Sequence, residues 1–330
     1  MSLSQPSVSD CVLHPMGDGR SSGFHRFIAS TPETRAICND ASVMGVDYTG
    51  RLETACVRIL QNLRTAGDLC LEEKESLVFN ILRGGLNFGL REALSRAFGW
   101  NRHSAAFISA QRARICDDPE HWHIVESEYS KVYMPKVASI VVGDVVATGT
   151  SLEHAMRALV HEAEKQGASL RSILFFTFGG VRAEEILEKT HGMCRDRFEA
   201  YENTTLIYLE GRFTVPTPET PLTIKLTGTD LLRWKADMAP EFVASQYEDP
   251  AFPLQRCAIY DAGSRAFWTP EHVADVEEYW MQCQALAEKG LGFADLLAER
   301  FPGLHPEAFG RVDLGKLCGR EVRRMQALKR

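Results

Sequence analysis

The chain has 330 residues, of which 45% are hydrophobic and 25% charged, and its net charge at pH 7 is −7. These proportions are ordinary for a globular protein, and the acidic balance excludes the overall basic surface of a nucleic-acid-binding protein. No stretch approaches the ~18 apolar residues of a membrane span, and the N-terminus lacks the basic start and apolar run of a secretory signal. The nine cysteines are scattered without a Cys-x-x-Cys pair, which predicts a reduced, cytoplasmic protein.

In chain order, the first seventy residues are expected to form loops and then a helix, whose apolar face runs from Leu52 to Leu63 and which Gly67 ends. Short apolar runs then alternate with amphipathic stretches. The five expected strands lie near 78–82, 106–110, 138–142, 173–178 and 205–209. Because apolar strands that alternate with helices indicate a parallel sheet covered on both faces, we predict an α/β fold with a mostly parallel, twisted sheet.

Two stretches interrupt this alternation. The polar residues 111–135 separate the second and third strands and are expected to form a long mobile loop that covers a site. Residues 213–256 are rich in proline and show little periodicity, so we predict an irregular insertion or a small subdomain. After Pro270 the chain is expected to be helical, with an interruption at Pro302 and Pro306 before a final helix.

The most informative segment joins the third strand to the helix after it, through Ala147-Thr148-Gly149-Thr150-Ser151. In an open parallel sheet, ligands bind beyond the carboxyl ends of the strands. The unpaired N–H groups at the start of the helix and the helix dipole favour a phosphate there. Gly149 lets the backbone approach it and the hydroxyls can donate to it, while Asp144 can meet sugar hydroxyls or a hydrated Mg²⁺. The alternative is an ordinary turn capped by Thr150 or Ser151.

The run from Ile140 to Ser151 resembles the signature of type I phosphoribosyltransferases. That signature has four apolar residues, two acidic residues, two apolar residues and then Ala/Asp-Thr-Gly-x-Thr/Ser. The resemblance implies that Ala147 to Ser151 hold the 5-phosphate of phosphoribosyl pyrophosphate. Gly143 departs from the signature, because the family usually has an acidic residue at this point.

Arg83-Gly84-Gly85 follow the first core strand. Paired glycines allow a tight backbone whose N–H groups can surround a pyrophosphate, and Arg83 adds a fork of donors. The segment is similar to the Ile-Leu-Arg-Ala-Gly-Leu pyrophosphate loop of uracil phosphoribosyltransferases. In those enzymes an arginine after the second strand contacts the pyrophosphate, and Arg112 occupies that position. A plain glycine turn with a surface arginine is the alternative.

Downstream, the segment around Asp261-Ala262-Gly263 resembles the hood that covers the base in uracil phosphoribosyltransferases. The resemblance implies that Gln255, Tyr260 and Ala262 face the acceptor. It also implies that Asp261 reaches phosphoribosyl pyrophosphate and, indirectly through water or that donor, its metal. Tyr260 replaces a glycine of the family right at the base.

The resemblance covers residues 76–270 and implies transfer of a 5-phosphoribosyl group from phosphoribosyl pyrophosphate to a nucleobase, with uracil as the expected acceptor. Pyrophosphate would be released, and Mg²⁺ would be carried with the donor. The expected catalytic residues are Arg83, Arg112, Asp144 and Asp261. Four units are expected. Residues 1–70 form an N-terminal extension and residues 71–212 the phosphoribosyltransferase core. Residues 213–270 form an insertion with the acceptor hood, and residues 271–330 a C-terminal helical extension.

Several alternatives stay open. Gly143 and Tyr260 favour a donor-sensing regulator or a partner-binding protein with little activity, and a transferase for another heterocycle is a third option. His121 and His123 suggest a metal site, although two histidines without further ligands are more often surface or packing residues. The basic residues 320–330 suggest either a surface for an acidic partner or a solvated helix. Small-molecule substrates are the expected partners, with self-association left open.

Overall fold

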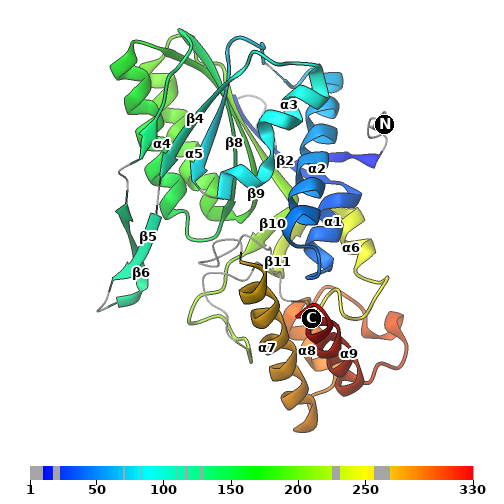
Figure 1. Ribbon diagram of the computed structural model, residues 1–330. Helices are drawn as coiled ribbons and strands as arrows, with labels where there is room; N and C mark the ends of the chain where they lie inside the picture. The colour runs from blue at the N-terminus through cyan, green and yellow to red at the C-terminus, as the bar shows by residue number, and fades with distance from the viewer. Residues whose placement is uncertain are drawn as a thin grey trace.

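The computed structural model describes residues 10–17, 23–69, 71–82, 84–109, 129–224, 231–255 and 268–329, and the backbone of 111–115 and 118–126. Figure 1 shows a layered α/β body at one end of the molecule and a group of C-terminal helices at the other. Within the described ranges, no helix combines the length and the hydropathy that a membrane-spanning segment needs.

A central sheet organises the α/β body. Its strands in the described part of the chain are β1 (Val12–Pro15), β2 (Phe24–Ser30), β3 (Ser76–Leu82), β4 (Ser104–Ser109), β7 (Ser130–Lys131), β8 (Val137–Val146), β9 (Ser169–Gly180), β10 (Asn203–Thr214) and β11 (Leu232–Met238). They are ordered β1-β2-β10-β9-β8-β3-β4-β7, with β11 also beside β10. The strands from β2 to β4 in this order run parallel, while β1, β7 and β11 are antiparallel to their neighbours. The prediction that the five expected strands share one mainly parallel sheet is confirmed.

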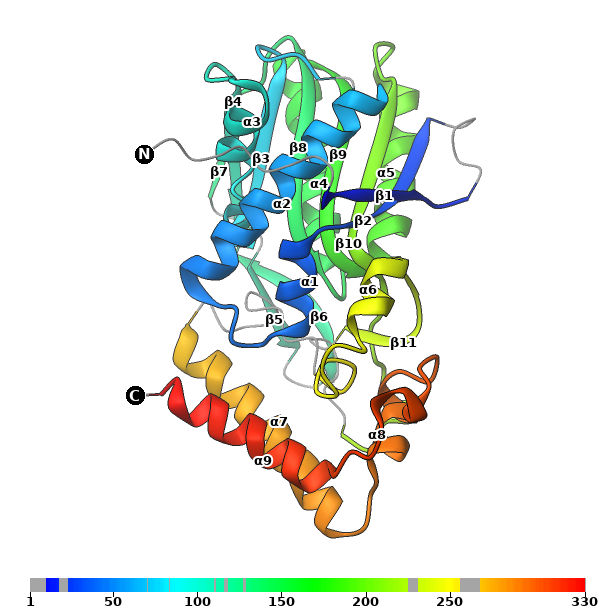
Figure 2. The same ribbon diagram turned by 90° about the vertical axis from the view of Figure 1, so that its right-hand side faces the viewer.

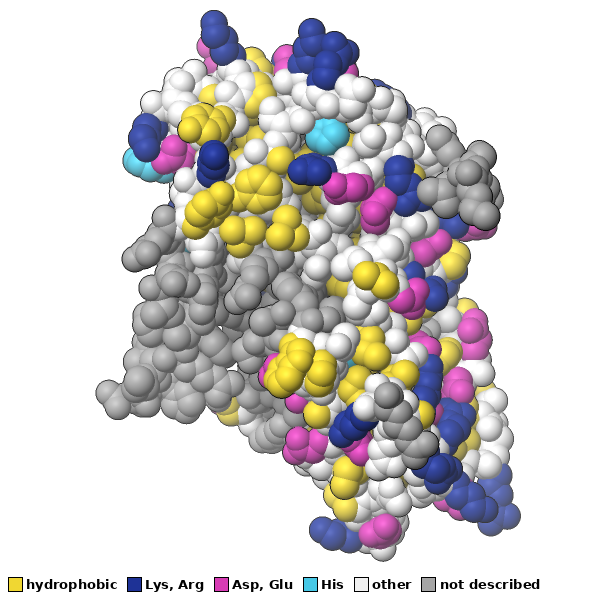
Figure 3. Space-filling view, viewed as in Figure 1, with side chains coloured by type: hydrophobic (Ala, Val, Ile, Leu, Met, Phe, Trp, Pro, Cys, Tyr) yellow, Lys and Arg dark blue, Asp and Glu magenta, His cyan; other side chains and the backbone are white. Residues whose placement is uncertain are grey.

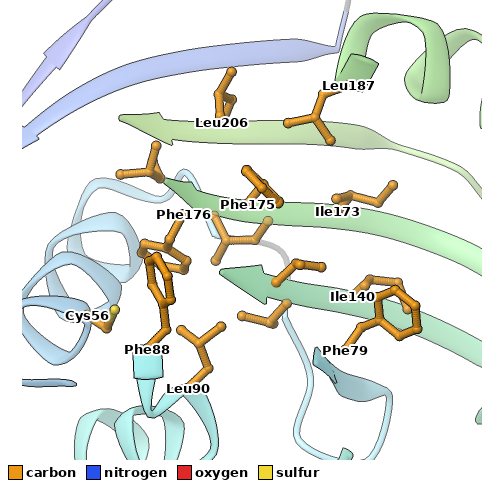
Figure 4. Packing of buried hydrophobic residues seen from close by; sticks show 14 of the residues in the cluster. Cys56, Phe79, Phe88, Leu90, Ile140, Ile173, Phe175, Phe176, Leu187 and Leu206 are labelled. Atoms are coloured by element: carbon orange, nitrogen blue, oxygen red, sulfur yellow. The ribbon is translucent and has the colours of Figure 1, made fainter. Parts of the chain in front are cut away.

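Helices cover both faces of this sheet, as the sequence predicted. They are α1 (Pro32–Asn39), α2 (Gly45–Ala66), α3 (Leu90–Phe98), α4 (Thr150–Gln166) and α5 (Val181–Arg197). Figures 1 and 2 show α2 and α3 on one side and α4 and α5 on the other. Figure 4 shows part of the core between these layers, to which the central strands, α2 and the segment before α3 contribute. The predicted end of α2 is also correct, since Gly67 caps it with a φ of 77°.

The N-terminal seventy residues differ from the expectation of loops and then a helix. They add β1 and β2 to the sheet, and β2 lies between β1 and β10. His25 and Arg26 interrupt the apolar pattern of this strand. Arg26 nevertheless fits there because its guanidinium pairs with Glu184 on α5, whose side chain is 8% exposed. A sequence pattern does not contain that tertiary ion pair.

The polar stretch 111–135, which was expected to form a long mobile loop, contains strands. Its described backbone forms a two-stranded antiparallel ribbon, made of β5 (Gln111–Ile115) and β6 (Asp118–Glu126), and then β7. Figure 1 shows the ribbon extending away from the sheet. Antiparallel pairing satisfies the backbone polar groups of a stretch that has few apolar residues to bury.

The C-terminal helices form a second packed unit. They are α7 (Thr269–Glu288), α8 (Phe293–Arg300) and α9 (Leu314–Ala327), while α6 (Pro240–Ser245) follows β11. The helices expected after Pro270 are therefore confirmed. Their buried side chains form a cluster of their own around Trp280 and Leu296. Met44 and Met238 pack against this cluster and against the main core.

The basic C-terminal residues 320–330 are largely paired within the chain. Arg320 contacts Asp249 at 2.6 Å, Arg324 contacts Asp40 at 2.5 Å, and Lys329 pairs with Glu277. Figure 3 shows Lys and Arg side chains interleaved with Asp and Glu side chains over the C-terminal helices. This favours the solvated-helix alternative over a surface for an acidic partner.

Candidate functional site

Two glycine-containing loops lie side by side at the carboxyl edge of the sheet. They follow β3 and β8, which are parallel neighbours. A Cβ built on Gly84 would lie 2.8 Å from the Oδ1 atom of Asp144, and one on Gly85 would lie 3.1 Å from the carbonyl oxygen of Gly143. The two loops therefore lie in close contact through their glycines, and the prediction that both open at the same edge is confirmed.

Gly143 is explained by packing. A Cβ at this position would lie 2.4 Å from the Cγ atom of Phe88, whose side chain is fully buried. Phe88 belongs to the short 3₁₀ helix Gly84–Phe88 that continues the loop after β3. The ring thus fills the space that the acidic residue of the family signature would need.

The N-terminus of α4 faces this edge. Its N-cap is Gly149, which has a φ of 77° and carries no side chain that could cap the helix. Thr150 and Ser151, the caps of the alternative turn, lie inside the first turn of the helix instead of at its N-cap. The hydroxyl oxygens of Thr148 and Thr150 lie 3.3 Å apart. A helix start at a glycine, two adjacent hydroxyls and the helix dipole together favour an anion here.

Asp144 lies between the two loops. Its side chain is half-buried, and its Oδ1 atom accepts a hydrogen bond of 3.0 Å from the backbone N–H of Val145. A carboxylate in this place can bind sugar hydroxyls or a cation. Among the described residues, no group of three or more His, Cys, Asp or Glu side chains is arranged to hold a metal ion.

Sequence reasoning missed a second glycine pair at the same edge. Gly179 and Gly180 end β9, and a Cβ on either would lie 2.8 Å from a backbone oxygen, that of Val146 or Phe213. The signal was present, because a glycine pair before a helix is the same pattern as at 84–85. It also missed Arg182, whose Cγ atom would lie 2.8 Å from a Cβ on Gly149.

On the acceptor side of the predicted site, the structure describes only Gln255. Its side chain is buried, and its Oε1 atom accepts a hydrogen bond of 2.9 Å from the indole of Trp280. Its carbonyl oxygen accepts from Arg233 at 2.9 Å. These contacts place Gln255 in the joint between the sheet and the C-terminal helices, and its contact with an acceptor stays a prediction.

The remaining predicted residues are not tested by the structure. Outside the described residues lie Arg83, Tyr260, Asp261 and Ala262. Arg112 lies in β5, but only its backbone is described, and the same holds for His121 and His123 in β6. Their roles stay predictions.

The comparisons with known proteins give distant structural likenesses only. The chain matches no protein-family model and no curated protein. A hypoxanthine-guanine phosphoribosyltransferase (hpt-2) from Bacillus anthracis str. 'Ames Ancestor' is similar at 18% identity and a TM-score of 0.26, over 40% of this chain and 69% of that one. An adenine phosphoribosyl transferase from Trypanosoma brucei is similar at 13% identity and a TM-score of 0.35, over 65% and 94%. A hypoxanthine phosphoribosyltransferase from Staphylococcus aureus is similar at 12% identity and a TM-score of 0.24, over 54% of this chain and 74% of that one.

Likeness at this level carries no conclusion about substrate. What the chain shares with many enzymes is a mixed α/β fold, with a central sheet between helices. Any functional inference therefore rests on the geometry at the carboxyl edge of this sheet.

Proposed function

We propose that the protein transfers a 5-phosphoribosyl group from phosphoribosyl pyrophosphate to a nucleobase, with uracil as the first acceptor to test. The observation that carries this proposal is the contact between the two glycine-containing loops. Gly84 lies against the carboxylate of Asp144, and α4 begins five residues further on, with Gly149 as its N-cap. A ligand with a phosphate at one end and a pyrophosphate at the other matches these two loops.

In this proposal the residues 147–151 anchor the 5-phosphate, and the loop at Gly84 and Gly85 receives the pyrophosphate together with Arg83 and Arg112. Asp144 and Asp261 orient the ribose hydroxyls. The C1–O bond to pyrophosphate breaks as the bond from C1 to the ring nitrogen forms, and the nitrogen's proton goes to solvent. Because positive charge develops on the ribose, catalysis depends on positioning and on neutralising the departing pyrophosphate. Mg²⁺ carried with the donor supplies further neutralisation.

A panel of bases tests the proposal directly. The protein is incubated with phosphoribosyl pyrophosphate, Mg²⁺ and one base at a time, and pyrophosphate release is measured. We expect release with at least one base. Thr148→Val keeps the side-chain shape but removes a hydroxyl donor, so donor affinity should fall about tenfold by calorimetry. Thr65→Val, which changes an exposed threonine of α2, is the matched control and should not alter affinity.

The alternative is a donor-sensing protein, and Tyr260 is the residue that favours it. A tyrosine ring in place of glycine either turns outward or fills the base site. If it turns outward, Tyr260→Gly should raise turnover with uracil and leave donor binding unchanged. If the parent and Tyr260→Gly both bind the donor but neither releases pyrophosphate with any base, the sensing function replaces the transferase. Pyrophosphate release with another heterocycle, and none with uracil, would mean that this heterocycle is the acceptor.

A further inference from the structure

Arg182 forms part of the wall of the loop at 147–151. It lies in the first turn of α5, next to α4 on the same face of the sheet. A Cβ built on Gly149 would lie 2.8 Å from the Cγ atom of Arg182 and 3.6 Å from its Nε atom. Ile186 lies one turn further along α5 and belongs to the same wall, since its Cδ1 atom would lie 2.5 Å from the Cβ built on Gly149. The loop backbone therefore packs directly on the stem of this arginine.

The charged side chains around this wall carry an excess of positive charge, which favours a bound anion. The residues 147–151 contain no Lys or Arg, so the loop itself offers only dipoles to a phosphate. Glu153, in the first turn of α4, would repel a phosphate bound there. Three cations surround this carboxylate, with N···O distances of 2.8 Å from Arg157, 3.1 Å from Arg182 and 3.8 Å from Lys189.

Of these three cations, only Arg182 packs against the loop at residues 147–151. Arg157 stands one turn further along α4 and is 62% exposed, whereas Arg182 is 44% exposed and contacts Gly149. Arg182 is also held by Glu185 at 2.9 Å. Two carboxylates thus fix its guanidinium beside the N-terminus of α4, which lowers the cost of ordering it when a ligand binds.

We propose that Arg182 supplies the positive charge that neutralises a phosphate group bound at residues 147–151, with Glu153 and Glu185 holding its guanidinium in place. This proposal rests on the proposed function, since it names a specificity-determining residue of the same phosphate site. Arg182 discriminates a phosphorylated sugar from an unphosphorylated one and has no part in binding pyrophosphate at the other loop.

The test compares two arginines that share one partner. Arg182→Gln and Arg157→Gln each remove a cation from Glu153, but only the first changes the wall of the loop. Affinities for ribose 5-phosphate and for pyrophosphate are measured by calorimetry on the full chain, with thermal midpoints as a check on folding. We expect Arg182→Gln to weaken ribose 5-phosphate about tenfold and to leave pyrophosphate unchanged. For Arg157→Gln, the affinities for both ligands should stay within about twofold of those of the parent. Arg182→Lys keeps the charge but not the planar fork, so it should recover only part of the loss.

The outcomes separate this proposal from the one it rests on. Parent protein that binds ribose 5-phosphate while Arg182→Gln binds it equally well overturns the role of Arg182 and leaves the transferase proposal standing. An equal loss for Arg157→Gln, or an equal loss for pyrophosphate, also overturns it, because the effect would then be one of general charge or folding. Parent protein that binds neither ribose 5-phosphate nor phosphoribosyl pyrophosphate overturns both proposals.

Discussion

The ring of Phe88 leaves no space for a side chain at Gly143, and this makes a prediction about stability. Gly143→Asp would introduce the acidic residue that the resembled signature has at this point. It should nevertheless lower the free energy of unfolding by about 3–5 kcal/mol, because it overpacks the core and buries a carboxylate. Urea denaturation of the parent and the variant measures the loss.

A double variant provides the control. Phe88→Ala alone should cost about 3–5 kcal/mol through the cavity that it leaves. Adding Gly143→Asp in that background should cost much less than it does in the parent, because the two positions share one space. Additive losses would mean that the ring does not fill the site of the missing side chain. If the losses couple, Gly143 reflects repacking and is not by itself a sign of lost activity.

Glu210 is a buried carboxyl group in an unusual backbone conformation. Its φ is 65°, and it lies where the pairing of β10 with β9 shifts register. It accepts hydrogen bonds from the Ser30 hydroxyl at 2.7 Å, the Thr31 N–H at 3.0 Å and the Thr34 hydroxyl. Burial raises the pKa of Glu210 to about 7, against the opposing effect of these hydrogen bonds and of the nearby Arg35.

This pKa makes stability depend on pH with a definite sign. The ordinary pKa of the group is 4.5, so the folded state binds the proton more tightly than the unfolded chain. The resulting stabilisation is complete below pH 4.5 and is lost as the pH rises through about 7. It amounts to about 3 kcal/mol.

Glu210→Gln should remove that component. The difference in unfolding free energy between parent and variant is measured in urea at pH 5, 6, 7 and 8. The parent should lose stability relative to the variant as the pH rises. Glu199→Gln, at an exposed position, should keep the parent's profile. Parallel profiles for the parent and Glu210→Gln would mean that Glu210 ionises at its ordinary pKa.

At the scale of elements, local patterns predicted the central strands and α4 because long apolar runs end there in clear glycine signals. The loops at 84–85 and 147–151 were found for the same reason. β2 was missed because Arg26 breaks its apolar run and is compensated by Glu184, far along the chain. The packing of Phe88 on Gly143 and of Arg182 on Gly149 also joins distant segments. No local signal in the sequence carries such contacts.

The ion pair between β2 and α5 gives an element-scale prediction. Arg26→Leu should leave Glu184, which is 8% exposed, with Arg212 as its remaining described cation. The free energy of unfolding should fall by about 1–3 kcal/mol, because a nearly buried carboxylate loses a partner. Arg91→Leu breaks the exposed pair with Glu92 and should cost less than about 0.5 kcal/mol in the same urea experiment. Equal, small losses would mean that the pair does not hold β2 in the sheet.

At the scale of the whole molecule, the sheet and the C-terminal helices are joined by buried polar contacts. The carboxyl ends of the central strands point toward the C-terminal helices in Figures 1 and 2. Arg233, which is 3% exposed, donates to the carbonyl oxygens of Gln255 at 2.9 Å and of Cys38 at 3.0 Å. The ring of His272 contacts the carbonyl oxygen of Ala41 at 2.7 Å. Since α7 and α9 have a core of their own, these contacts decide whether the two units unfold together.

We expect them to unfold together in the parent and separately once Arg233 is replaced. Hydrogen exchange read by mass spectrometry should give peptides of α7 and α9 the same opening free energy as peptides of β8 and β9. Arg233→Met leaves two buried carbonyl groups without this donor, so the helical peptides should then exchange at an opening free energy about 2–4 kcal/mol lower. Arg311→Met, at an exposed position, should leave both sets unchanged. Faster exchange of α7 and α9 already in the parent would mean that the helices fold as an independent unit, and that the joint at Arg233 and Gln255 does not couple them to the edge of the sheet where the two loops meet.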